Sequence, residues 1–108
     1  MGSGTVNQLY VDEVVEIFNK KEPDYVFVDV RQPEEWEQGT IPGAVKISLG
    51  ELEDRLDELD KNKKYIMVCR SGNRSNRASY ILLENGFGEI NNFQGGMLAW
   101  EENDYPVE

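Results

Sequence analysis

The sequence of 108 residues contains no histidine, a single cysteine and about half as many basic as acidic residues. Without histidine, the chain can form neither a Cys/His zinc site nor a cysteine–histidine catalytic pair. One cysteine cannot close an internal disulfide bond, so chemistry at this thiol has to be activated by other groups. The formal net charge of −10 argues against broad binding to nucleic acid or to an anionic membrane surface, because both require positive charge.

The chain also lacks long apolar runs. None approaches the roughly 20 residues that span a bilayer, and the start MGSGTVNQLY has neither the basic nor the apolar region of a signal peptide. We therefore expect a cytoplasmic protein that does not associate with membranes. The length fits one domain, which we assign to residues 5–106, and we expect a monomer. Residues 1–4, MGSG, can be a remnant of cloning.

Short apolar runs alternate with segments of helical periodicity. YVFVDV (residues 25–30) and YIMV (65–68) have the nearly continuous apolar character of strands buried on both faces. This alternation predicts an α/β domain of three layers, with a mainly parallel central sheet and helices on both faces. Further strands are predicted at AVKIS (44–48) and EINNF (89–93), and helices from Val11 to NKKEP, in QPEEWEQG (32–39), and over residues 49–64, 75–86 and 97–103.

The basic residues cluster around the cysteine. Residues 61–83 contain no acidic residue and carry a charge of +6, while the rest of the chain carries −16. Cys69 follows the predicted strand 65–68 directly, and ligands of such sheets bind beyond the carboxyl ends of the strands. A cationic functional site is one interpretation of this cluster. Chance clustering around a buried strand, with Cys69 as a small structural thiol, is the other.

The segment VCRSGNRS (68–75) has the composition of an anion-binding loop. Gly72 can adopt a positive φ, which lets successive backbone N–H groups point at one place. Those N–H groups, the positive end of the following helix and nearby guanidinium groups lower the pKa of a cysteine without an imidazole base. We therefore predict that Cys69 is the catalytic nucleophile, in an active-site loop formed by Arg70, Ser71, Gly72, Asn73, Arg74 and Ser75.

Several side chains of this region allow two interpretations. Arg74 can bind a substrate, or it can brace the loop through its own hydrogen bonds. Arg70 is expected to point outward and select the donor, whereas Arg77, one helical turn beyond Arg74, extends the patch or is simply solvated. Ser71 and Ser75 can donate hydrogen bonds to the sulfur, and Ser75 can equally cap the next helix.

Three segments occur in an order that resembles the single-domain rhodaneses: DVRQPEEWEQGTIPGAVKI, CRSGNRS and FQGGMLAW. The resemblance covers about residues 5–106. It implies that Cys69 takes a sulfane sulfur from a small anionic donor such as thiosulfate, forms a persulfide, and passes the sulfur to cyanide, a small thiol or a protein. It also implies that Asp29 and Arg31 brace the site. Neither a metal nor an organic cofactor is required by this chemistry.

Two details accompany the resemblance. Thr40 stands where the family often has a histidine, which removes a possible hydrogen bond but leaves the catalytic loop unaffected. Gly95 and Gly96 are expected to allow a close backbone turn beside the pocket.

Three hypotheses remain for the function. Phosphatases use a loop C-x5-R, whereas Cys69 and Arg74 form C-x4-R, the shorter loop that by resemblance belongs to sulfurtransferases. A phosphatase or arsenate-reducing enzyme on a related loop is the second hypothesis, and a non-catalytic rhodanese-like module that binds a protein is the third. A thiol buried away from solvent, with the neighbouring peptide nitrogens facing elsewhere, would contradict an enzyme.

Overall fold

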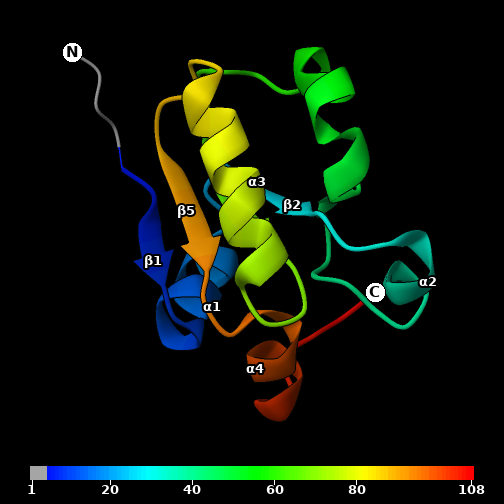
Figure 1. Cartoon of the computed structure of the whole chain (residues 1–108). Helices are drawn as coiled ribbons and strands as arrows, with labels where there is room; N and C mark the ends of the chain where they lie inside the picture. The colour runs from blue at the N-terminus through cyan, green and yellow to red at the C-terminus, as the bar shows by residue number, and fades with distance from the viewer. Residues whose placement is uncertain (1–4) are drawn as a thin grey trace.

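Five parallel strands form one sheet in the computed structural model of residues 5–108 (Figure 1). The strand order is β1-β5-β4-β2-β3, and every pairing is parallel. The strands are β1 (Asn7–Leu9), β2 (Tyr25–Asp29), β3 (Val45–Lys46), β4 (Lys64–Val68) and β5 (Ile90–Phe93). Between and after them lie α1 (Val11–Lys20), α2 (Pro33–Trp36), the 3₁₀ segment η1 (Leu49–Glu58), α3 (Asn73–Glu84) and α4 (Gly96–Glu102).

The predicted α/β class with a parallel sheet and helices on both faces is confirmed. One apolar cluster packs α3 and η1 against the sheet, and it includes Val28, Leu52, Met67, Cys69 and Leu82. A second cluster packs α1 and α4 against the opposite face, and it includes Val14, Ile66, Val68, Phe93 and Trp100. Successive residues of β4 therefore enter different clusters, because side chains alternate between the faces of a strand. This two-sided burial is the reason why YIMV is continuously apolar.

Strand β1 was not predicted from the sequence. It comprises only three residues, two of them polar and exposed, and it pairs with β5 alone at the edge of the sheet. A strand that buries so little apolar surface carries no periodic signal.

The segment predicted as a helix over residues 49–64 also differs from the prediction. It is a 3₁₀ helix that ends at Glu58 and is interrupted at Arg55, whose φ and ψ are −124° and 19°. Leu49 and Leu52 are three residues apart, as are Leu56 and Leu59, and this spacing matches three residues per turn.

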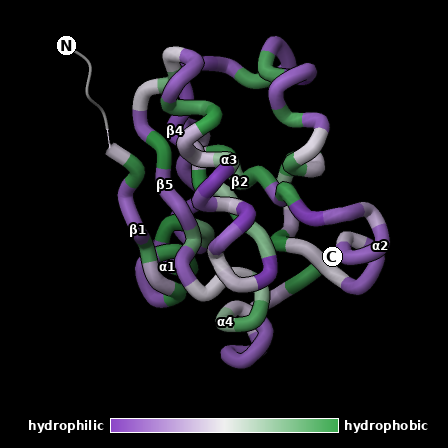
Figure 2. Tube along the Cα trace, in the orientation of Figure 1, coloured by the Kyte–Doolittle hydropathy of each residue, from purple (hydrophilic) through white to green (hydrophobic). Residues whose placement is uncertain are grey.

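Strand β5 is unusual because its middle is hydrophilic. Figure 2 shows the hydropathy along the chain, and the sequence INNF places Asn91 and Asn92 between Ile90 and Phe93. Both asparagines are buried, with 2% and 0% of their surface exposed. Buried amides need hydrogen-bond partners, and those of Asn92 lie at the site described below.

Within residues 5–108, no helix is both long enough and apolar enough to cross a membrane.

Candidate active site

Cys69 and Asp29 lie at the same edge of the sheet. Strands β2 and β4 are parallel neighbours, and Asp29 pairs in register with Val68, the residue before Cys69. This is the carboxyl edge, where the sequence predicted a ligand site. The loop Cys69–Gly72 connects β4 to α3 along this edge.

The loop carbonyls are turned toward α4. The carbonyl oxygens of Cys69 and Arg70 accept hydrogen bonds from the N–H groups of Met97 and Leu98, at 2.9 and 3.0 Å, and that of Ser71 accepts from Gly95 at 3.0 Å. The N–H and C=O of a trans peptide point in opposite directions. The N–H groups of the same three peptides are therefore directed away from α4. The last of them, the N–H of Gly72, donates to Sγ of Cys69 at 3.1 Å.

Glycines permit this close packing of two loops. Gly72 has a φ of 117°, and Gly95 and Gly96 have φ values of 98° and 52°. A Cβ atom on Gly96 would overlap the carbonyl oxygens of Cys69 and Arg70. Gly95 and Gly96 thus form the close backbone turn that the sequence predicted beside the pocket.

The Cys69 thiol is buried, with 1% of the residue exposed. Burial raises the pKa of Cys69, but the contact with the Ser75 side chain and the hydrogen bonds from the N–H groups of Ser75, Gly72 and Ser71 outweigh it, so that the pKa falls below its ordinary value. The thiol is thus buried while peptide nitrogens face it. Of the two conditions that together would contradict an enzyme, only burial is met.

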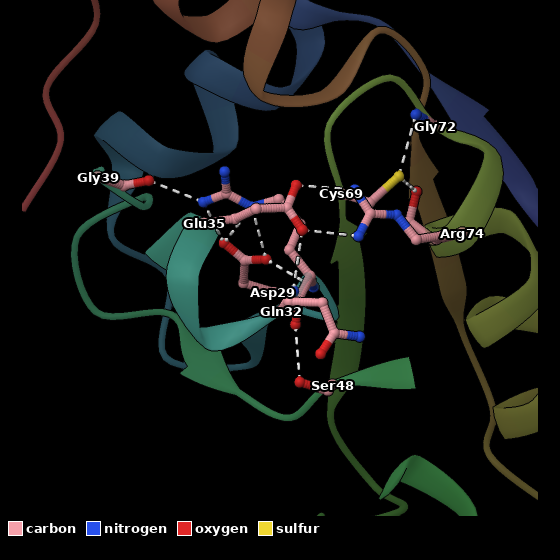
Figure 3. A network of polar contacts seen from close by, with 10 residues as sticks. Asp29, Gln32, Glu35, Gly39, Ser48, Cys69, Gly72 and Arg74 are labelled. Atoms are coloured by element: carbon pink, nitrogen blue, oxygen red, sulfur yellow. Dashed lines mark hydrogen bonds and ion pairs between the residues drawn. The ribbon is translucent and has the colours of Figure 1, made fainter. Parts of the chain in front are cut away.

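Arg74 forms a bidentate ion pair with Glu35 of α2, shown in Figure 3. The distances are 2.8 Å from Nη1 to Oε1 and 2.9 Å from Nη2 to Oε2. The Arg74 hydrogen bonds lower the pKa of Glu35 to about 2, against a rise from partial burial and with help from the N–H of Gln32. The hydrogen bonds with Glu35 raise the pKa of Arg74. A thiolate at Cys69 is close enough to raise the pKa of Arg74 as well, by a smaller amount.

The structure therefore gives Arg74 a bracing contact that the sequence left open as one of two interpretations. The sequence did not indicate Glu35 as a site residue. A partly buried cationic side chain favours an acidic partner, but with 21 acidic residues in the chain the sequence offered no way to choose one.

The other two arginines of the patch line separate cavities. Exposed Arg70 lines a cavity of about 360 Å³ together with residues of β2's end, α2 and α4, namely Arg31, Glu35, Gln38, Met97, Leu98 and Glu101. Arg74 and Arg77 line a second cavity of about 370 Å³, with Gln32, Leu49, Gly50, Glu53 and Ile81. Among residues 5–108, neither Arg70 nor Arg77 has an acidic group within ion-pair distance.

Ser71 and Asn73 are exposed, whereas Ser75 is fully buried. The alternative in which Ser75 caps the next helix is wrong, because α3 begins at Asn73 after Gly72, and Ser75 is its third residue. Ser75 Oγ lies 3.3 Å from Cys69 Sγ and donates to Oδ1 of Asn92. Asn92 was not predicted as a site residue, although a polar residue between apolar strand positions was a signal for it.

Asp29, labelled in Figure 3, forms a buried ion pair with Arg31 at the end of β2. Arg31 Nη2 lies 2.8 Å from Asp29 Oδ2 and donates to the carbonyl of Gly39 at 2.7 Å. Thr40 Oγ1 also donates to Asp29 Oδ2, at 2.7 Å. The expectation that Thr40 removes a hydrogen bond at this position is therefore wrong, because a threonine hydroxyl supplies one here.

The fold and the loop define an α/β protein with a cysteine surrounded by backbone donors at the carboxyl edge of a parallel sheet. The rhodanese-like domain family matches residues 10–103, and the chain belongs to this family of sulfurtransferases.

Individual relatives agree with this assignment. YtwF of Bacillus subtilis, provisionally named a sulfurtransferase, is 44% identical over 79 residues, covering 73% of this chain and 76% of its own. The thiosulfate sulfurtransferase GlpE of Pseudomonas syringae is 34% identical, with 82% of each chain covered. The crystal structure of a rhodanese-like domain protein from Staphylococcus aureus superimposes with a TM-score of 0.85 at 34% identity, covering 95% of this chain and 97% of the other.

Proposed function

We propose that this protein is a thiosulfate sulfurtransferase that carries sulfur as a persulfide on Cys69. The observation that carries the proposal is the N–H of Gly72, which points at Sγ at 3.1 Å while the carbonyls of the same loop are tied to α4. Such fixed donors stabilise a negatively charged sulfur without rearranging during the reaction. The name of the GlpE relative supports thiosulfate as the donor.

The reaction consists of two displacements at sulfur. The Cys69 thiolate attacks the outer sulfur of thiosulfate, a new S–S bond forms, and the S–S bond of thiosulfate breaks so that sulfite leaves with the electron pair. The terminal sulfur of the persulfide then carries the negative charge that the loop N–H groups face. An acceptor, either cyanide or a thiolate, attacks this outer sulfur and regenerates the Cys69 thiolate. Thiocyanate or an acceptor persulfide is the product.

The arginines divide the work of attracting the donor. Arg74 has its charge paired with Glu35, so in this proposal it mainly fixes the start of α3 and adds a positive field at Cys69. Arg70 is exposed and lines a cavity beside the loop, so it is the arginine that meets an incoming anion. We also place the reaction in the cytoplasm, where free thiols remain reduced, and assign the acceptor role to a small thiol or a thiol of a partner protein.

Mass spectrometry of the intact protein tests this function. After incubation with thiosulfate, the wild-type protein is expected to gain the mass of one sulfur atom, and cyanide should remove it. The Cys69→Ser variant is the matched control, since it keeps the side-chain size and removes the only thiol, and it should gain nothing. An unchanged wild-type mass together with hydrolysis of an aryl phosphate would favour the phosphatase hypothesis. If neither reaction occurs, the non-catalytic binding module is the better explanation.

A further inference from the structure

The two buried asparagines of β5 serve different parts of the molecule. The amide of Asn91 donates to the carbonyl of Tyr65 at 3.0 Å and accepts from Asn7 at 3.0 Å. The amide of Asn92 lies on the other face of the strand, where it contacts Ser75 and Gly72 of the Cys69 site. Asn92 therefore reaches the site, while Asn91 offers a matched control on the same strand.

The hydrogen bonds fix which way the Asn92 amide points. Its Nδ2 donates to the carbonyl of Gly72 at 3.1 Å and to Oε1 of Gln8 at 2.8 Å, with a longer contact to Oε1 of Gln94 at 3.3 Å. Gln8 in turn donates its own Nε2 to Oδ1 of Asn76 at 2.8 Å, which leaves its Oε1 for Asn92. The Oδ1 atom of Asn92 consequently faces Ser75, and a carbonyl oxygen can only accept.

This orientation determines where the Ser75 hydrogen lies. A serine hydroxyl has one hydrogen, and Asn92 Oδ1 receives it. Toward Cys69, 3.3 Å away, the Ser75 oxygen can then only accept, and the group that donates to it is the neutral thiol S–H. A thiolate cannot donate a hydrogen bond. To stabilise a thiolate, Ser75 has to turn its hydrogen to the sulfur and leave Asn92 Oδ1 buried without a donor.

We propose that Asn92 is a positioning residue that keeps the Ser75 hydroxyl turned away from the sulfur and thereby favours the neutral thiol of Cys69 in the resting protein. On ionisation the S–H bond breaks, the proton passes to solvent, and the Ser75 O–H rotates from Asn92 Oδ1 to the thiolate. The inference rests on the proposed function only in taking Cys69 as the reactive group.

Charged groups also lie on the elements around Cys69, but they are separate from this contact. They are Arg70 in the loop, Arg74 of α3 with its partner Glu35 of α2, Asp29 with Arg31 at the end of β2, and Glu101 of α4 beside Arg70. None of them has a hydrogen bond to the side chain of Asn92. A neutral replacement of Asn92 therefore changes the Ser75 hydrogen bond without changing any charge.

The pH dependence of Cys69 alkylation by iodoacetamide tests the inference. Replacing Asn92→Ala releases the Ser75 hydrogen, so the midpoint of the alkylation rate should fall by about one pH unit, the effect of one hydrogen bond to a charged group. Asn91→Ala should leave the midpoint unchanged. In a Ser75→Ala background, Asn92→Ala should cause no further shift, because its effect passes through the hydroxyl. An unchanged or raised midpoint in Asn92→Ala overturns the inference, and so does an equal shift without Ser75.

Two further measurements guard against a variant that does not fold. Asn92→Leu keeps the side-chain volume, removes the acceptor and should lower the midpoint in the same way. In the unmutated protein, the side-chain amide ¹⁵N signal of Asn92 should titrate with Cys69, whereas that of Asn91 should stay constant. A flat Asn92 signal contradicts the inference. Alkylation requires no sulfur transfer, so shifted midpoints in a protein that thiosulfate does not load would reject the proposed function and retain this role of Asn92.

Discussion

The ends of β2 and β4 lie side by side at one edge of the sheet, yet they use their polar groups in opposite ways. At the end of β2, Asp29 is satisfied within the protein by Arg31 and Thr40. At the end of β4, the N–H of Gly72 donates to a single sulfur atom, that of Cys69. The β2 end, here called the closed end, pairs its own charges. The β4 end presents a backbone donor to sulfur and is here called the reactive end, after the role that Cys69 has in the proposed function.

In the proposed function, this difference lets one edge of the sheet hold a rigid part beside a reactive part. The β2 end contains opposite charges that neutralise each other, with side-chain exposures of 6% for Arg31 and 0% for Asp29. A buried pair of this kind contributes to stability only while both partners are present. The β4 end gains its electrostatic stabilisation from uncharged peptide groups, so the negative charge it favours is the one that forms on sulfur.

The largest effect is expected from breaking the closed end. Asp29→Ala leaves the Arg31 charge buried without its partner, and it should lower the free energy of unfolding by about 3–5 kcal/mol in urea denaturation. Glu58→Ala, which removes one partner of Arg55 in an exposed pair, is the control and should cause no measurable change. Equal effects of the two substitutions would show that the β2 end is not a closed structural unit.

The next effect concerns the support of the reactive end. Gly96→Ala places a methyl group against the carbonyl oxygens of Cys69 and Arg70, and the φ of 52° at this position disfavours alanine. Displacement of the loop should lower kcat/KM for sulfur transfer from thiosulfate to cyanide about a hundredfold. Gly88→Ala is the control, because nothing lies within 4 Å of a Cβ atom there. A folded Gly96→Ala protein with normal activity would show that sulfur transfer does not depend on how α4 holds the loop.

A smaller effect is expected at the rim of the reactive end. Arg70 is exposed and has no ion pair among residues 5–108, so Arg70→Ala should raise KM for thiosulfate about tenfold with little change in kcat. Arg55→Ala, outside the cavity that Arg70 lines, serves as the control. Added salt should reduce the difference between wild type and Arg70→Ala, since it screens an exposed charge. A salt-independent difference would mean that Arg70 acts through structure.

The smallest effect concerns Glu35, which connects α2 to the reactive end. Its pKa of about 2 is lowered from the ordinary value, so its ion pair with Arg74 stabilises the fold above the pKa of the unfolded state, near 4.3. Glu35→Gln should therefore be less stable than wild type at pH 6 by about 1 kcal/mol, since water screens a pair that is about one-third exposed.

The difference between the two proteins should shrink as the pH falls from about 5 toward 2, because over this range Glu35 takes up a proton in the unfolded wild type while it stays largely ionised in the folded protein. Urea denaturation at several pH values measures it. A difference that stays constant down to pH 2 would assign the stability to packing of Glu35, with no contribution from its charge.

The sequence predicted the parts of this protein that depend on neighbouring residues. The alternation of YVFVDV and YIMV with helical segments sufficed for the α/β class, since burial on both faces requires continuous apolar runs. Cys69, Gly72 and Arg74 could be predicted as parts of one site because they lie within six consecutive residues. The short strand β1 and the 3₁₀ character of η1 escaped, because they carry weak or ambiguous periodicity.

The amino-acid sequence by itself determined that a thiol follows a buried strand in a loop of small and cationic residues, since these are local properties of the chain. Only the tertiary structure decided that Glu35 pairs with Arg74, that Asn92 receives the Ser75 hydrogen and that α4 turns the loop carbonyls away from the sulfur. The physical reason is that a hydrogen bond depends on distance and direction between atoms. When its partners belong to different elements, the packing of the sheet and helices sets both.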